Sequence, residues 1–317
     1  MPPSFVHRIT KYDPADRGEH GHYTGAEETV SDHGPVEAAY LAAVAAFAEA
    51  SGIERLETRE PAVTGFVHFG AEPPAEGHGL AGLFPPDLTG YHDGAEVSLP
   101  VALELVRAML RDQGAWCRLE APGERFTVHV GYDQYVYVGS DRPCADAVAR
   151  TRELGLFPEP MTASPYAADS DDAEAPGAAD EDFWTRVRAV LDVRRSALLE
   201  EAYVRNAERW HRIAPGNLDK VRAGLTPRAV LTVWPDLTPD VGAVLAALPE
   251  DGAVEFVWEA PDGTVSSALV DDTEYQELAA LVADARAARA LPVHFDERDP
   301  LLRAVLPDGD GVVRARW

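Results

Sequence analysis

A stretch of small and acidic residues near the middle of the chain most constrains its fold. Residues 161–182 read MTASPYAADSDDAEAPGAADED, with seven acidic side chains, no basic ones and few large apolar groups. A segment of this composition cannot bury enough apolar surface to offset the entropy lost on ordering, and it is typical of a flexible linker. We therefore predict two domains, 1–160 and 183–317, joined by an acidic disordered linker at 161–182.

The N-terminal half alternates between strand-like and helix-like patterns. Alternating apolar residues predict strands at 5–12, 63–70, 115–120, 125–130 and 135–139, and apolar residues at helical spacing predict helices at 35–52, 98–114 and 142–155. The first helix has Pro35 at its start and Gly52 at its end, which are typical residues for those positions. Helices interleaved with mostly antiparallel hairpins predict an α+β domain in which helices cover one sheet.

The C-terminal half, 183–317, is predicted to be a second α+β domain that begins with a long helix. This helix is expected to run from about Asp182 to Ile213, where the sequence APGN ends it. The elements predicted after it are a strand at 228–234, a helix at 238–248, a hairpin at 253–270, a helix at 271–289 and a hairpin at 301–317. Each domain is thus expected to be a mostly antiparallel sheet covered by helices.

The charge balance excludes several classes of partner. The chain has 28 basic and 54 acidic residues, a formal net charge of −26. Nucleic acids gain much of their affinity from phosphates neutralised by Lys and Arg, so non-specific binding to duplexes or anionic membranes is disfavoured. Such a field instead favours encounter with a basic partner. The sequence shows no signal peptide pattern and only two cysteines, which predicts a cytoplasmic location with reduced thiols.

A histidine-rich loop near the N-terminus raises the question of a metal site. His20, His22 and His33 lie among acidic residues, and imidazole and carboxylate groups are zinc ligands. The metallo-β-lactamase pattern HxHxDH would continue with Asp-His, whereas this chain reads HGHYTG. Three glycines also leave the backbone loose. The pattern favours a solvated loop, with a zinc site or a partner-binding loop as alternatives.

The sequence contains one false match to a nucleotide-binding motif and no other common catalytic motif. GHGLAG at 77–82 matches GxGxxG, but the prolines that follow prevent a helix from starting in register, so we predict no dinucleotide binding and no cofactor. No GxSxG elbow, P-loop or HExxH sequence occurs. Cys117 and Cys144 lack a recognisable base partner and are interpreted as structural.

An aromatic strand supplies the candidate interaction residues. In GYDQYVYVG, Tyr135 and Tyr137 alternate with valines, so the tyrosines are expected on the sheet face that the helices leave open. Such a face can stack unpaired bases or contact another protein. The candidate residues are Tyr132, Tyr135, Tyr137, Trp116 and Arg118.

Several stretches of the first half resemble a group of uncharacterised actinobacterial proteins. They include FVHRITKYDPADRGEHGHYTG, DLTGYHDGAEV, LVRAMLRDQGAWCRLE and VHVGYDQYVYVG, and the resemblance covers about residues 4–166. Some members of that group are labelled RNA-binding, so the resemblance implies RNA as a partner. It supplies no catalytic residues.

The sequence as a whole predicts a non-enzymatic, acidic interaction protein that binds a basic protein, for example as an inhibitor or immunity-type partner. Two alternatives stay open. One is a single-stranded RNA-binding protein that uses the aromatic sheet face, and the other is a metal-dependent hydrolase that uses the N-terminal histidines. The first alternative requires the tyrosines for RNA binding, and the second requires stoichiometric zinc that is lost when His20 and His22 are replaced.

Overall fold

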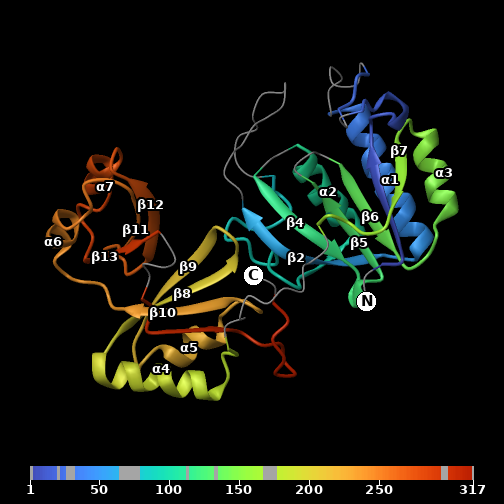
Figure 1. Ribbon diagram of the computed structural model, residues 1–317. Coiled ribbons are helices and arrows are strands. Elements are labelled where there is room, and N and C mark those ends of the chain that lie inside the picture. Colours follow the sequence, from blue (N-terminus) through green and yellow to red (C-terminus); the bar gives the residue numbers. More distant parts are fainter. Residues whose placement is uncertain are drawn as a thin grey trace. The chain divides into compact units, whose positions relative to one another are not determined.

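The computed structural model describes residues 3–19, 22–25, 33–63, 79–111, 114–131, 135–166, 177–293 and 299–315. Over these residues the fold is α+β, with seven α-helices and three antiparallel sheets (Figure 1). The predicted fold class is therefore confirmed. The chain forms two compact units, the first mainly from Met1–Ala173 and the second from Glu174–Tyr203 and Ala207–Ala315. No helix of the described ranges is long and apolar enough to cross a membrane.

The first unit is built on a seven-stranded sheet in the order β3-β2-β4-β5-β6-β1-β7, in which neighbouring strands are antiparallel. Its strands are β1 (Phe5–Thr10), β2 (Arg55–Val63), β3 (Glu96–Ser98), β4 (Ala115–Glu120), β5 (Phe126–Val130), β6 (Val136–Ser140) and β7 (Phe157–Met161). Its helices are α1 (Pro35–Ser51), α2 (Leu99–Leu110) and α3 (Ala145–Glu153). Helix α1 packs against both of the others and against the middle of the sheet.

Helix α1 forms where it was predicted, because the residues at its ends and its apolar face all favour a helix over the same range. Pro35 occupies the first turn, and Gly52 ends the helix at φ 66°, a conformation that glycine adopts without strain. Tyr40, Val44 and Phe47 are buried against the sheet side. Phe47 contacts the ring of His7 on β1 at a centroid distance of 5.3 Å, which ties the helix to the β1 side of the sheet.

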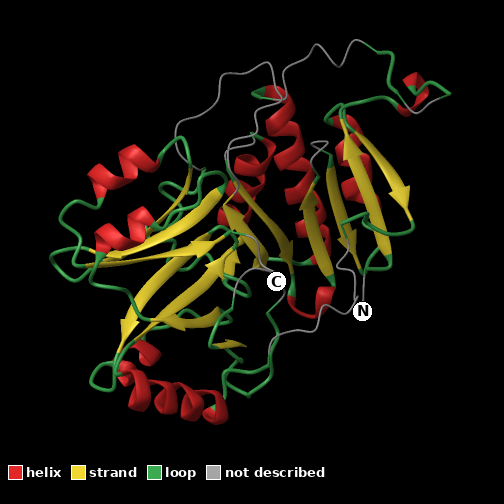
Figure 2. Ribbon diagram, turned by 60° about the vertical axis from the view of Figure 1, so that its left-hand side comes forward, coloured by secondary structure: helices red, strands yellow, loops and turns green. Residues whose placement is uncertain are grey.

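The second unit contains two smaller sheets, β14-β10-β8-β9 and β12-β11-β13. Its strands are β8 (Ala197–Val204), β9 (Ala207–Ile213), β10 (Val230–Pro235), β11 (Ala253–Glu259), β12 (Val265–Asp271), β13 (Ala287–Pro292) and β14 (Leu302–Val305). Its helices are α4 (Glu181–Arg194), α5 (Leu218–Ala223), α6 (Val241–Ala246) and α7 (Tyr275–Leu281). Figure 2 shows α4 at the bottom of the view, along the outer side of the four-stranded sheet.

Side-chain packing joins the two sheets of the second unit. A buried cluster of Leu198, Trp210, Trp234, Val257 and Leu291 draws on both sheets. The other face of the three-stranded sheet forms a separate cluster with α6 and α7. Each strand of the three-stranded sheet therefore presents one row of side chains to the four-stranded sheet and the other row to the helices.

The long helix predicted from Asp182 to Ile213 is wrong. Helix α4 ends at Arg194, and the remaining residues form the hairpin β8–β9. Asn206 adopts φ 64° in the hairpin turn, a conformation that asparagine tolerates well. Strand β8 is held by antiparallel pairing with β10, about thirty residues further along, which local periodicity does not reveal.

Two further elements in the second half differ from the prediction. The helix predicted at 271–289 is only α7, and residues 287–292 instead form β13, which pairs with β11. The hairpin predicted at 301–317 contributes one strand, β14, which pairs with β10. Its PDGDG sequence still turns the chain, since Asp308 N donates to Val312 O at 3.0 Å. In the first half, the strand predicted at 63–70 lies outside the described residues after Val63.

The described ends of the predicted linker take part in folded structure. Met161 is the last residue of β7, and it pairs with Val6. At the other end, Asp180 caps α4 by accepting hydrogen bonds from the backbone of Asp182 and Phe183. Residues 167–176 lie outside the described residues.

Arg195 provides a test of how α4 ends. It is exposed and has φ 73°, a backbone conformation that is strained for a residue with a Cβ atom. Arg195→Gly is expected to raise the free energy of unfolding by about 0.5–1 kcal/mol, because glycine adopts this conformation freely. Arg186→Gly, in the middle of the same exposed helix face, is the control and should lower it by about 1 kcal/mol. Urea denaturation followed by tryptophan fluorescence measures both, and equal effects would contradict this explanation.

Candidate functional site

The face of the first sheet opposite the helices carries charged and aromatic side chains. Strand alternation places Arg8 of β1, Tyr137 of β6 and His129 of β5 on this face, and the strand register aligns Arg8 with Tyr137 and Tyr137 with His129. Glu159 of β7 lies opposite Arg8 and accepts two hydrogen bonds from its NH2 group, both at 2.9 Å. A row of polar groups thus crosses the sheet.

This face is covered in the structure, so the expectation that it is open is wrong at its centre. Tyr137 is 4% exposed and Arg118 is 3% exposed. The chain after β7 lies over them: the ring of Tyr166 contacts that of Tyr137 edge-on at 5.4 Å, and Arg118 NH1 donates to Tyr166 O at 2.9 Å. Ser164 Oγ lies 3.1 Å from His129 Nδ1. A base could reach Tyr137 only if this segment moved.

The other predicted interaction residues lie at different places. Trp116 is half-buried and donates its indole N–H to Val130 O at 3.1 Å. Tyr135 is half-buried at the start of β6, where Arg8 lies 5.2 Å from its ring centre. Tyr132 lies outside the described residues. The five candidates therefore do not form one continuous exposed face among the described residues.

A second aromatic cluster, not predicted from the sequence, lies at the end of β1. The rings of Tyr12 and Tyr23 stack at 4.7 Å, and Tyr135 meets Tyr12 edge-on at 6.1 Å. Each ring also has a cation near its face, at 5.2–5.7 Å: Arg8 at Tyr135, Lys11 at Tyr12 and Arg17 at Tyr23. We call these six residues the tyrosine cluster. The only sequence signal was the short spacing of Arg8, Lys11 and Tyr12.

The predicted metal residues are only partly described. His20 lies outside the described residues. The backbone of His22 accepts a hydrogen bond from Gly18 N at 2.8 Å, within a short bridge between Arg17 and Tyr23. Within the described ranges, no three His, Cys, Asp or Glu side chains are grouped closely enough to hold a metal ion.

Cys117 is buried in the first unit and is not suited to nucleophilic chemistry. Burial raises the pKa of its thiol to about 12, so the thiolate is scarcely populated at neutral pH. Cys144 is also buried, and its sulfur lies 3.4 Å from Ser51 Oγ. The burial of both cysteines fits the structural role predicted for them.

One charged network of the second unit joins its two sheets. Arg212 of β9 donates to both carboxylate oxygens of Asp236 at 2.8 and 2.7 Å, and to Glu259 of β11 at 2.5 Å. Burial raises the pKa of Asp236, but the hydrogen bonds from Arg212 and Ser196 outweigh it, so the pKa lies below its usual value. The network is structural, because its charges satisfy one another.

A second network surrounds the fully buried carboxylate of Glu201. His211 Nε2 lies 2.7 Å from Glu201 Oε2, and Thr226 N donates to Oε1 at 2.6 Å. Burial raises the pKa of Glu201, but these hydrogen bonds outweigh it, and the pKa is lowered. Arg209 lies 3.8 Å from the same carboxylate and 4.3 Å from the ring centre of Tyr203. The carboxylate of Glu201, on β8, is thus held in its charged form on the side of the four-stranded sheet that faces away from the three-stranded sheet.

Residues 240–289 of the second unit carry a large excess of negative charge. This stretch contains eleven acidic and two basic residues. Leu269 and Leu281 in the same stretch are 66% and 63% exposed. We call its nine exposed carboxylates the acidic surface: Asp240, Glu250, Asp251, Asp262, Asp271, Asp272, Glu274, Glu277 and Asp284.

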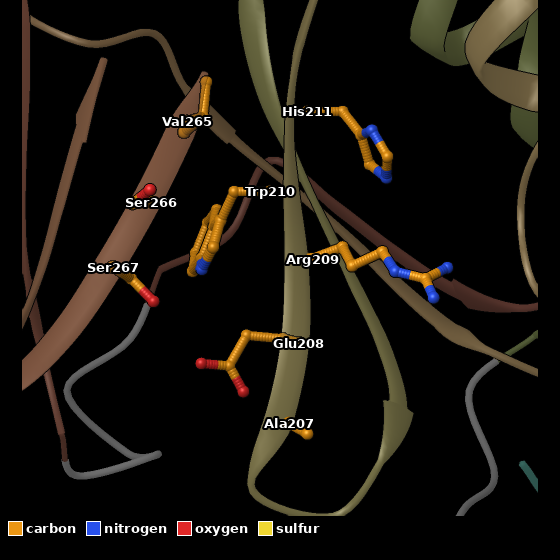
Figure 3. A pocket seen from close by; sticks show the side chains of 8 residues that line it. All are labelled: Ala207, Glu208, Arg209, Trp210, His211, Val265, Ser266 and Ser267. Carbon is orange, nitrogen blue, oxygen red and sulfur yellow. The ribbon is translucent and has the colours of Figure 1, made fainter. Parts of the chain in front are cut away.

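A hollow of about 510 Å³ lies between the edge strands β9 and β12, and we call it the β9–β12 hollow (Figure 3). Figure 3 shows Trp210 and Glu208 directed toward β12, whereas Arg209 and His211 point to the other side of β9. Val265 and Ser267 line the opposite wall. Sequence analysis missed this site, because its two walls come from a hairpin predicted as a helix and from a separate sheet.

Comparison of the chain with protein-family models, with curated proteins and with solved structures finds no match.

Asp236 provides a test of the network between the sheets. Asp236→Asn is expected to lower the free energy of unfolding by about 2 kcal/mol at pH 7, since it removes a charge-assisted pair that is mostly buried. The folded state depresses the pKa of Asp236, so its stabilising effect is present above the unfolded pKa of about 3.9 and is lost as the pH falls through the lower folded value. Urea denaturation at several pH values should show the difference shrink below about pH 4. The exposed Glu250→Gln is the control and should behave like wild type; a difference for Asp236→Asn that does not change with pH would contradict the assignment.

Proposed function

We propose that this chain is a non-enzymatic interaction protein that binds a basic protein through the acidic surface of its second unit. The observation that carries the proposal is that residues 240–289 expose nine carboxylates and two leucines and contain only two basic residues. An interface of this kind combines apolar contacts with a charged rim, and the charge steers an oppositely charged partner into place. An inhibitor or immunity-type partner of a basic nuclease-like protein would use its carboxylates where the nuclease binds phosphates.

Two carboxylates of this surface are held in the charged form by local hydrogen bonds. Asp271 accepts from the hydroxyl of Thr273, and Asp262 accepts from the backbone of Thr264 at 2.9 Å. These hydrogen bonds keep the pKa of both groups below the usual value for aspartate. Their bonds lie within turns and leave the negative charge on the surface, where a cation of a partner can meet it.

The salt dependence of binding tests this proposal. The immobilised full chain retains partners from the native host's cytoplasm, and affinity is then measured with the purified partner between about 50 and 500 mM salt. We expect a basic partner whose affinity falls steeply with salt. The triple variant Asp272→Asn/Glu277→Gln/Asp284→Asn should bind about tenfold more weakly, because each charge at the rim contributes about 0.5 kcal/mol.

The matched control removes the same number of exposed charges from the first unit, as Glu49→Gln/Asp141→Asn/Asp146→Asn. It should bind like wild type. An affinity that does not change with salt, or an equal loss in both triple variants, would contradict a specific acidic surface.

The tyrosine cluster supports a second candidate function, the binding of single-stranded RNA. Stacked aromatic rings with cations at their faces are the elements that bind unpaired bases and their phosphates. The cluster is also the part of this acidic chain where several cations gather around aromatic rings.

Replacing two of these tyrosines tests the second candidate. Tyr12→Ala/Tyr135→Ala is expected to weaken binding of a fluorescent single-stranded oligoribonucleotide by at least tenfold, since stacking contributes about 1–3 kcal/mol per base. Tyr137 is a poor probe, because it is buried and its loss would affect stability. Tyr40→Phe, which keeps a ring buried in α1, is the control. No measurable binding by wild type would exclude this function.

A further inference from the structure

Trp210 on β9 is buried, and its indole N–H has no hydrogen-bond acceptor in the part of the chain that the structure describes. The residue is 7% exposed, and its Nε1 atom has no partner among the described residues. Three other tryptophans donate the same group at normal distances: Trp116 to Val130 O and Trp184 to Ala179 O, both at 3.1 Å, and Trp234 to Glu200 Oε2 at 2.7 Å. An unmade hydrogen bond of this kind is unfavourable, so an acceptor brought to Trp210 would bind favourably.

The indole nitrogen is directed into the β9–β12 hollow. Figure 3 shows it pointing to the space between Ser267 and Glu208. Both walls of the hollow are edge strands, since β9 ends the four-stranded sheet and β12 ends the three-stranded sheet. An edge strand presents backbone N–H and C=O groups that can pair with an added strand.

The wall formed by β12 continues into an exposed apolar residue and then an acidic one. Every second side chain of β12 points to the same face, and on this face lie Val265, Ser267, Leu269 and Asp271. Leu269 is 66% exposed, although this face packs against the four-stranded sheet further along. Asp271 is exposed at the end of the row. A segment lying along this wall would therefore meet the indole N–H of Trp210, then the apolar side chain of Leu269, and then the carboxylate of Asp271.

We propose that the β9–β12 hollow binds an extended basic segment of the partner protein, which adds as a strand to the edge of β12. One of its backbone carbonyls accepts the hydrogen bond from Trp210 Nε1. An apolar side chain covers Leu269, and a lysine or arginine side chain reaches Asp271. The inference rests on the proposed function and names the part of the partner that is recognised.

Charge complementarity selects this occupant over others. Asp271 is exposed at the end of the β12 wall. Arg209 borders the hollow but points to the other side of β9, where it lies 3.8 Å from Glu201. A basic strand is therefore attracted. A second copy of β12 contains no lysine or arginine that could reach Asp271.

The experiment selects peptides from a displayed library of random ten-residue sequences on the immobilised full chain. We expect enriched peptides that are basic and that alternate apolar and polar residues. The best of them, made synthetically, should bind Trp210→Phe at least tenfold more weakly than wild type, because phenylalanine fills the same core space without an N–H group. Val193→Ser, at an exposed apolar residue of α4 outside the acidic surface, is the matched control and should bind like wild type.

A second measurement is independent of the folding of Trp210→Phe. In the ¹⁵N-labelled wild-type chain, one indole N–H signal should shift and become protected from exchange when the peptide is added. Replacing alternate residues of the peptide by proline, which removes backbone donors, should abolish binding.

The outcomes separate the two proposals. Basic peptides that bind Trp210→Phe as tightly as wild type, yet lose affinity for Asp272→Asn/Glu277→Gln/Asp284→Asn, would overturn the hollow and leave the acidic surface standing. Enrichment of acidic or uncharged peptides, or of none, would overturn both. Self-association of the chain that Trp210→Phe abolishes would show that a second copy is the occupant and would also overturn the proposal.

Discussion

The packing of two sheets through side chains, without strand pairing between them, is the constraint on which the second unit depends. Trp210 and Trp234 of one sheet meet Val257 and Leu291 of the other in a single buried cluster. Had the sheets merged by hydrogen bonding, β9 and β12 would have become inner strands. Because they are joined face to face, β9 and β12 each stay at the end of a sheet among the described residues, and a hollow forms between them. The Arg212 network then fixes the end of this arrangement by linking β9 to β11.

The two units use buried charge in different ways. In the first unit, polar residues such as Arg118 and His129 occupy a sheet face that the chain itself covers with Ser164 and Tyr166. In the second unit, Glu201 is held in a compact network, and nine carboxylates of residues 240–289 are exposed. Burying a charge is unfavourable unless it is paired, so surface carboxylates in excess of the available cations are best satisfied by water or by a partner's cations. This contrast is why the second unit, and not the aromatic sheet face, supports the proposed interaction with a basic protein.

Local patterns in the sequence were sufficient to predict an element whose ends and apolar face are set by its own residues. Helix α1 was predicted to within a residue because Pro35, Gly52 and its apolar stripe agree, and the turn at Gly263 placed the β11–β12 hairpin. They were insufficient where pairing comes from far along the chain. The sequence of β8 is compatible with a helix, and its pairing with β9 on one side and β10 on the other makes it a strand. The candidate sites failed to appear for the same reason: Tyr166 covers Tyr137 from 29 residues away, and Trp210 faces Ser267 from another sheet.

The acidic residues around β12 have a second physical role that bears on specificity. An open strand edge is a site of self-association, and natural proteins commonly protect such edges with charged side chains. Asp271 and Asp272 lie at the end of this strand, so two copies that paired in parallel would bring four carboxylates together. The same charges that oppose self-pairing reduce the cost of approach for a basic strand. Protection alone, however, gives no reason for a buried indole donor aimed at the hollow, since a purely defensive edge would place its tryptophan N–H against an acceptor, as Trp234 does with Glu200. Acidic charge beside an indole donor that has no acceptor among the described residues therefore fits the proposed recognition of a basic strand better than protection of the edge alone.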